Sequence, residues 1–335
     1  MEGIERVGIL HGRPLQLYIN PVTANILVGT ASWTDKTLIA CGRFYPPGCT
    51  TAEQRLRFYA GAFPLVEVDS SYYGIPTPRN AQLWAERTPA GFTFNVKAFR
   101  LFTGHPAPVD VLPRDIQQAL GSRRATELPA LRGAGTAGEL READLPPELA
   151  DELWRRFIEA LAPLRAAGKL GAVHFQFAPW VHCDRAGIAL VERCVQRMPG
   201  HLLAAEFRHR SWFDGDRTDR TLAFLRRLGL VHTVVDAPQG FANTVPCVWD
   251  TTHPDLALLR LHGRNSRMWN AKGLAASSSR FDYQYSGDEL AAMLPEIRQL
   301  ATQARRVHVI FNTNNADQGQ RGAQMLARLL QVNLR

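Results

Sequence analysis

The sequence predicts an α/β protein of the (β/α)8 class, a TIM-type barrel. Eight apolar segments bounded by turn residues have the composition of buried strands, and helical patterns separate most of them. The chain has 335 residues, which is enough for a barrel of about 250 residues with insertions. An open doubly wound sheet is the alternative. It is disfavoured because the turn after the first strand reads GTASW and lacks the phosphate-binding pattern GxGxxG.

The predicted strands are short apolar runs, and the predicted helices have apolar residues three and four positions apart. The strands are Ile26–Thr30, Leu65–Asp69, Phe92–Lys97, Ala172–Phe177, Leu202–Phe207, Val231–Asp236, Leu256–His262 and Val307–Asn312. The helices are Thr51–Phe63, Arg79–Arg87, Pro147–Ala167, Asp184–Met198, Thr218–Leu228, Gly287–Ala304 and Gly319–Val332.

Two segments lie outside the bare barrel pattern. Residues 1–25 form an N-terminal extension with an alternating apolar pattern, which predicts a hairpin before the first strand. Residues 103–147 are rich in Pro, Gly, Ala and Arg and show no core pattern, so they are interpreted as an insertion that is either a lid or mobile. Residues 26–335, with this insertion, form the barrel domain.

Composition excludes several classes of protein. Hydrophobic residues make up 45% and charged residues 21% of the chain, so it can bury a full core and is neither disordered nor fibrous. No charge-free apolar window reaches the length of about 18 residues that a membrane helix needs, and the first residues do not resemble a secretory signal. The five cysteines form no CxxC pair and are expected to be reduced thiols of a cytoplasmic protein. The net charge of +8 mildly favours an anionic partner.

Polar residues alternate along most of the predicted strands. Because successive strand residues point to opposite faces, residues two apart share a face. Helices cover the outside of a barrel, so the apolar face is expected to point outward and the polar face toward the axis. The polar sets are Glu67 and Asp69; Asn95 and Lys97; His174 and Gln176; Glu206 and Arg208; His232 and Asp236; Arg260, His262 and Arg264; and His308, Asn312 and Asn314. They converge at the C-terminal mouth, where the active sites of such barrels lie.

These strand-end residues belong to longer strings that resemble a known family. The strings are GTASW, FYPPG, VEVDSSYYGIP, FTFNVKAF, AAEFRHRSW, LRLHGR and VIFNTNN, in this order from about Ile26 to the C-terminus. Together they resemble the YecE-like family, domain of unknown function 72. The resemblance implies a TIM-type barrel and no established activity. It places the family's motif positions at Trp33, Glu67, Asp69, Tyr72, Lys97, Glu206, Arg208, Asp236, Arg260, His262, Arg264 and Asn312. Where such chains often read FNN, this one reads FNTNN, which leaves open whether Asn312, Asn314 or Asn315 faces the site.

Acid–base chemistry is the reaction type that this residue set favours. Glu67, Asp69, Glu206 and Asp236 would bring four carboxylates together, and carboxylates in unlike environments can divide the acid and base roles. The set could also hold a divalent metal ion. Metal is less favoured than none, because Lys97, Arg208, Arg260 and Arg264 would repel a cation. A glycosidase is a minority alternative, since the seventh strand ends without a second carboxylate.

Two functions of different classes remain open. In the first, an enzyme acts on a phosphorylated or otherwise anionic substrate that is sugar-like or derived from nucleic acid. Glu206 and His262 are then the acid–base pair, Lys97 and Arg260 hold the anion, and Asp69 and Asp236 orient the substrate. In the second, the mouth binds a phosphometabolite or nucleic acid without catalysis, and a basic stripe would continue onto Arg123, Arg124, Arg132 and Arg141. Neither involves a membrane.

His262 is the centre of the enzymatic hypothesis. Two flanking arginines should depress the pKa of its ring and keep it neutral at pH 7. Gly263 should let the chain turn sharply after it. We expect His262 to line the mouth cavity beside a carboxylate, whereas His105, as a loop histidine, is expected to be solvated.

Overall fold

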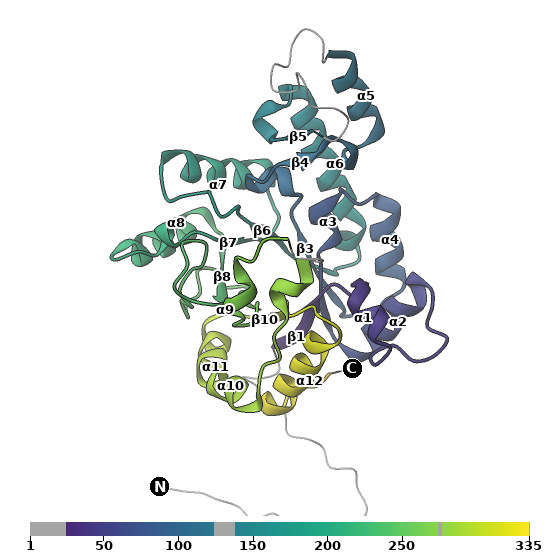
Figure 1. The fold of residues 1–335 in the computed structure, drawn as a ribbon, viewed down its shortest axis with the longest axis vertical. Coiled ribbons are helices and arrows are strands. Elements are labelled where there is room, and N and C mark those ends of the chain that lie inside the picture. The colour runs from purple at the N-terminus through teal and green to yellow at the C-terminus, as the bar shows by residue number, and fades with distance from the viewer. Residues whose placement is uncertain (1–24, 124–137, 274–276, 335) are drawn as a thin grey trace, which may run out of the picture.

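The computed structural model describes residues 25–123, 138–273 and 277–334. In this part of the chain, eight parallel strands close into a barrel with the order β1-β10-β9-β8-β7-β6-β3-β2 (Figure 1). The strands are β1 (Ile26–Ala31), β2 (Leu65–Val68), β3 (Thr93–Lys97), β6 (Leu170–Gln176), β7 (Leu203–Glu206), β8 (Val231–Asp236), β9 (Ala257–Leu261) and β10 (Val307–Phe311). All eight predicted strands and the (β/α)8 architecture are therefore confirmed.

The predicted helices are present on the outside of the barrel. They are α2 (Ala52–Ala62), α4 (Pro78–Glu86), α6 (Pro147–Ala166), α7 (Arg185–Arg197), α8 (Arg217–Leu228), α10 (Gly287–Ala292), α11 (Leu294–Gln303) and α12 (Gln318–Leu330). The helix predicted over Gly287–Ala304 is divided at Met293, because Pro295 in the first turn of α11 has no N–H for a continuous helix. Short helices occupy the loops at α1 (Lys36–Cys41), α3 (Ser70–Tyr73) and α9 (Ser266–Trp269). None of the helices in the described residues is both long and apolar enough to span a membrane.

The two additional segments have different outcomes. The predicted hairpin of residues 1–25 falls on residues 1–24, outside the described residues. Within the insertion, β4 (Ala107–Pro108) pairs antiparallel with β5 (Glu139–Leu140), and α5 (Arg114–Arg123) lies near them at one end of the molecule (Figure 1). Val109, Ile116 and Leu120 are buried and belong to the main hydrophobic core. The expectation that 103–147 lacks a core pattern is thus wrong for its described part, because these apolar residues pack on the barrel.

The barrel interior changes from apolar to charged along its axis. A small internal cluster takes one residue or two from most strands and contains Ala31, Leu65, Ala172, Ala204, Val231, Leu256, Leu258 and Ile310. One layer closer to the mouth lie Glu67, His174, Glu206 and Arg260, two positions after cluster members on the same strands. The parity prediction is confirmed for these strands. Burying charge there has a large desolvation cost, so these groups need partners.

Candidate functional site

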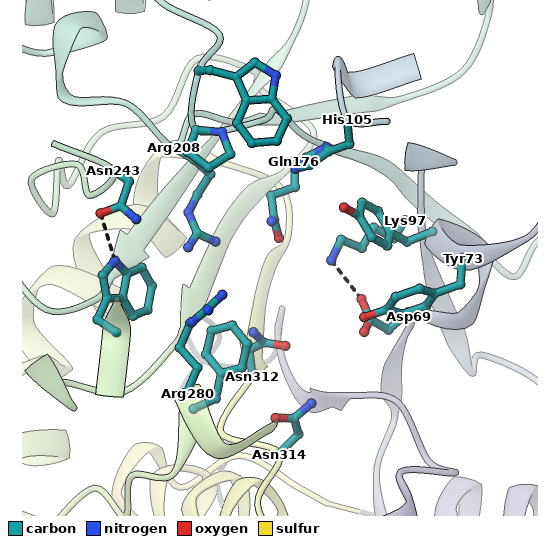
Figure 2. Close-up of a pocket in the computed structure, with 15 residues that line it drawn as sticks. Asp69, Tyr73, Lys97, His105, Gln176, Arg208, Asn243, Arg280, Asn312 and Asn314 are labelled. Atoms are coloured by element: carbon teal, nitrogen blue, oxygen red, sulfur yellow. Dashed lines mark hydrogen bonds and ion pairs between the residues drawn. The ribbon is translucent and has the colours of Figure 1, made fainter. Parts of the chain in front are cut away.

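The carboxyl ends of the strands surround a pocket of about 300 Å³. Asp69, Lys97, Gln176, Arg208 and Asn312 reach it from the ends of five different strands (Figure 2). Loop residues complete the lining, namely Tyr72, Tyr73, His105, Pro179, Trp180, Asn243, Trp269, Arg280, Phe281 and Asn314. A pocket of this size, with a few converging polar groups, is typical of a small-molecule site.

Two arginines form one wall of the pocket. Figure 2 shows the guanidinium groups of Arg208 and Arg280 pointing into it from the same side. Arg208 donates one hydrogen bond of 3.2 Å to Glu206 and stacks over Trp269, 4.9 Å from the ring centroid. Burial lowers the pKa of Arg208, and Arg260 and Arg280 lower it further against the opposing effect of Glu206. The positive groups therefore repel one another.

Arg280 was not predicted as a site residue. It lies between the seventh and eighth barrel strands, where the sequence shows no strand pattern. Among the described residues no carboxylate pairs with Arg280, and its buried Nε has no hydrogen-bond partner. The Arg280 side chain is half-buried, and a guanidinium whose buried Nε has no acceptor is costly unless a ligand supplies one.

An ion pair forms the opposite wall. Lys97 Nζ lies 2.9 Å from Asp69 Oδ1 (Figure 2). It also lies 4.5 Å from the centroid of the Tyr72 ring. Burial raises the pKa of Asp69, but Lys97, together with Arg260 and His174, outweighs burial, so the pKa lies below its usual value and the carboxylate is ionised. The Asp69 side chain retains 20% of its exposure, so it can contact a ligand.

His105 lines the pocket and is not solvated, contrary to expectation. The chain turns at Gly104, with φ of 82°, and this brings the His105 ring between the rings of Tyr72 and Trp180. Its Nδ1 lies 3.0 Å from the hydroxyl of Thr103. Burial, followed by Lys97 and Arg100, lowers the pKa of His105 to about 3, so the ring is neutral at pH 7. The run Thr-Gly-His in the loop that follows β3 was the available sequence signal.

A closed ionic network lies beneath the pocket. Arg260 donates to Glu67 at 2.6 Å and to Glu206 at 2.7 Å, and all three side chains are fully buried. His174 lies between the two carboxylates, 3.5 Å from Glu67 and 3.4 Å from Glu206. Burial favours the neutral acid, but Arg260 and His262 outweigh it and hold the pKa of Glu206 well below its usual value. The pairing offsets the desolvation cost of these charges.

His262 connects this network to the pocket floor. Its Nε2 lies 3.2 Å from Glu206 Oε1, and its Nδ1 lies 2.9 Å from Asn312 Nδ2. An amide nitrogen only donates, so Nδ1 accepts and Nε2 carries the proton toward Glu206. Burial lowers the pKa of His262 to about 3, Glu206 opposes it, and Arg260 and Arg208, not the predicted Arg264, contribute less. The predicted neutral ring agrees with this direction, but its main cause is burial. The prediction that His262 lines the cavity is wrong, because the ring is 1% exposed and Asn312 covers it.

Asp236 and Arg264 lie away from the network. In the ladder between β8 and β9, Val235 pairs with Arg260 and Asp236 pairs with Leu261, so Asp236 points outward. There it accepts from Arg264 at 2.9 Å and from the hydroxyl of Tyr285 at 2.5 Å. The prediction from alternation fails on β8, because residues outside the barrel form hydrogen bonds with the polar side chains on the outward face of this strand. His232 on the same face likewise lies 3.1 Å from the Val248 carbonyl.

Trp33 is also outside the pocket. It is 6% exposed and makes edge contacts with Trp84 of α4 and with Phe94, at centroid distances of 5.9 and 6.3 Å. Tyr72 does reach the pocket, as do both Asn312 and Asn314. In the described part of the chain, no three His, Cys, Asp or Glu side chains are grouped so that they could hold a metal ion.

The chain is similar to known proteins in both sequence and fold. The family model "Protein of unknown function DUF72" matches residues 27–335. The UPF0759 protein YunF of Bacillus subtilis (strain 168) is 31% identical over 307 residues, which cover 91% of this chain and 94% of YunF. A crystal structure of a DUF72 family protein from Enterococcus faecalis V583 has a TM-score of 0.72 at 24% identity, covering 92% of this chain and 97% of that one. One from Thermotoga maritima MSB8 has a TM-score of 0.68 at 26% identity, covering 91% and 99%.

Proposed function

The chain belongs to the DUF72 family, and we propose that this member is an enzyme for a small anionic substrate. The substrate is phosphorylated or otherwise anionic, and is sugar-like or derived from nucleic acid. The single observation that carries this proposal is the pair of guanidinium groups, Arg208 and Arg280, that face one pocket with a single carboxylate contact between them.

An anion would relieve the electrostatics of this wall. Arg280 and Arg260 both act to lower the pKa of Arg208. In the ligand-free pocket these positive charges therefore repel one another, and the repulsion is unfavourable. Arginine donors match phosphate and carboxylate oxygens in a fork geometry, which makes such groups the natural ligand. Trp269 and Phe281 lie beside the arginines and offer apolar surface to the rest of the ligand.

The opposite wall supplies the acid–base groups. Asp69 is an ionised carboxylate that accepts a proton or a hydroxyl hydrogen bond, and Lys97 stabilises its charge. His105 is a neutral ring in the same pocket and can accept a further hydrogen bond. A ligand anchored by the arginines would present its hydroxyl groups to this side, as general acid–base catalysis requires.

The sequence predicted Glu206 and His262 as the acid–base pair, and in this proposal they do not have that role. Both are closed off beneath the floor, and neither lines the pocket. We assign them, with Glu67 and Arg260, to positioning. Glu206 accepts a hydrogen bond from Arg208, and His262 accepts one from Asn312, so each buried residue orients one residue that lines the pocket. The acid–base role moves to Asp69.

A non-catalytic binding protein for a phosphometabolite is the second candidate, because the arginine wall would serve it equally. The size of the pocket favours either of these over a nucleic-acid strand, which needs a basic stripe beyond the mouth. Of the arginines proposed for such a stripe, Arg124 and Arg132 lie outside the described residues.

Calorimetric titration with inorganic phosphate tests the anion site. Arg280→Gln should weaken phosphate binding by about tenfold or more, the range for a charge-assisted hydrogen bond. Arg305→Gln is the matched control, because the Arg305 side chain is 78% exposed and lies at the opposite end of the barrel, before β10. Equal affinities for wild type and Arg280→Gln would contradict the proposal.

A further inference from the structure

A second cavity, of about 380 Å³, lies next to the mouth pocket, and Trp180 lines both. We propose that one ligand occupies the two cavities together. Its anionic group lies against Arg208 and Arg280, and a planar heterocycle lies against Trp180 and extends into the second cavity. The ligand is therefore of the nucleotide class. This inference rests on the anion site of the proposed function and narrows its substrate.

The wall between the cavities is thin. The consecutive residues Gly104 and His105 line different cavities, Gly104 the second and His105 the mouth pocket. At Gly104, a Cβ atom would come within 3.0 Å of Val181 Cγ2, so the backbone packs tightly there. Trp180 lines both cavities and is 49% exposed, so it is the residue that a group reaching from one cavity to the other would contact.

Trp180 is held as a rigid platform. Its Nε1 donates a 3.0 Å hydrogen bond to the Gly104 carbonyl, and the His105 ring makes an edge contact at a centroid distance of 5.5 Å. The side chain is nevertheless 49% exposed. Tryptophan is usually well buried, so a fixed and half-exposed indole has free surface for a stacking partner.

The second cavity differs from the first in chemistry. Its apolar lining comes from Leu101, Val181, Leu190 and the alanines of α7, Ala186 and Ala189.

Within the described part of the chain, the charged groups that line the second cavity have partners of their own, apart from Arg141. Arg193 pairs with Glu142 at 3.1 Å, and Asp184 caps α7 by accepting from the Gly187 N–H at 2.9 Å. Arg141 is left as a donor at the edge of a mostly apolar cavity, which suits a planar group whose edge carries hydrogen-bond acceptors. The pocket and the cavity therefore match the two halves of a nucleotide.

Calorimetry with ribose 5-phosphate and adenosine 5′-monophosphate isolates the contribution of the base. The nucleotide should bind about tenfold tighter or more, since stacking of a base on an aromatic side chain has an effect of this order. The measured quantity is the ratio of the two affinities: Trp180→Ala should bring this ratio close to one, whereas Trp180→Phe should keep most of it. Ala189→Trp, at an exposed helix position that lines the second cavity, should fill the cavity and reproduce the effect of Trp180→Ala.

The outcomes separate the two proposals. If both compounds bind equally and depend on Arg280, the nucleotide inference is wrong and the anion site stands. If Trp180→Ala weakens both compounds alike, the inference is likewise overturned. If neither compound nor phosphate binds, the anion site is wrong and the inference falls with it.

Discussion

Asn312 donates a 2.9 Å hydrogen bond to Nδ1 of His262, and this bond joins the pocket floor to the buried charges beneath it. The bond fixes the tautomer of the ring, because the amide nitrogen has no acceptor capacity. It leaves Nε2–H to face Glu206. The tautomer of His262, which does not line the pocket, is thus set by Asn312, which does.

Replacing this donor with an acceptor should charge the ring. In Asn312→Asp, Nδ1 faces a carboxylate and must carry a proton to bond with it, while Nε2–H still faces Glu206. The pKa of His262, lowered to about 3 by burial, should rise by more than two units, about the effect of a close opposite charge. Imidazole nitrogen NMR across a pH titration measures it. Asn314→Asp is the control, because Asn314 lines the same pocket without bonding to His262. A wild-type ring that is protonated on Nδ1 would contradict the assignment.

The lowered pKa of His262 in the wild-type protein makes the free energy of unfolding depend on pH. In the unfolded chain the imidazole has a pKa of about 6.5 and is protonated below that pH. In the folded protein His262 is protonated only near pH 3. The contribution of His262 to stability is therefore full above about pH 6.5 and is lost as the pH falls toward 3. Asn312→Asp should flatten this part of the pH dependence in urea unfolding.

Removing the central cation should destabilise the fold strongly. Arg260→Met leaves the carboxylates of Glu67 and Glu206 buried without their shared partner. The expected loss is about 3–5 kcal/mol of unfolding free energy. Arg57→Met is the control, because its pair with Glu53 is solvent-exposed on both sides and should contribute less than about 1 kcal/mol. Urea denaturation of both variants at pH 7 measures the difference, and equal losses would show that the network is not what stabilises this layer.

Asp69→Asn should separate binding from turnover. The amide retains the shape of the side chain and loses the base, so turnover should fall about 100-fold, within the range for general acid–base groups. Phosphate affinity should change less than about threefold, because the arginines lie on the opposite wall (Figure 2).

Phosphorus NMR over a panel of sugar phosphates and nucleotides measures turnover. Asp236→Asn is the control, since Asp236 points outward from the barrel and should leave turnover intact. Turnover by Asp69→Asn equal to that of wild type would remove Asp69 from the mechanism. If wild type turns over none of these compounds, the non-catalytic binding protein becomes the better hypothesis.

The turn after β9 should depend on glycine. Gly263 has φ of 80°, and a Cβ atom there would lie 2.4 Å from Tyr283 Cβ. Gly263→Ala should therefore cost more than the roughly 1 kcal/mol that positive φ alone imposes on a side chain. Gly240→Ala is matched to it, with φ of 91° and no atom within 4 Å of the added Cβ. Thermal unfolding of the two variants should show a larger drop for Gly263→Ala, and similar drops would contradict the packing explanation.

Much of the fold was predictable from local patterns. Runs of apolar residues marked all eight barrel strands, and the alternation at Glu67, His174, Glu206 and Arg260 correctly placed these residues inside the barrel. A strand's alternation is a property of its backbone, so the pattern survives folding. The exception is the sixth barrel strand, β8, where both faces carry polar groups and alternation alone does not say which face is inside.

The candidate site was predictable only in part. Asp69, Tyr72, Lys97, Arg208 and Asn312 were predicted and do reach the pocket. Arg280 and His105 were not, because loop residues carry no periodic signal that fixes their direction. Trp33 was predicted but packs against α4, and only the arrangement of the outer helices decides this contact.

The sequence by itself determined the barrel, its eight strands and the end at which polar groups gather, since these follow from hydrophobic periodicity and chain direction. The tertiary structure decided which of those groups a ligand can reach. Depth along the barrel axis separates Asp69 and Arg208, which line the pocket, from Glu206 and His262, which lie closed beneath it. That depth depends on how side chains from several strands and loops pack over one another, and no single segment of the sequence encodes it.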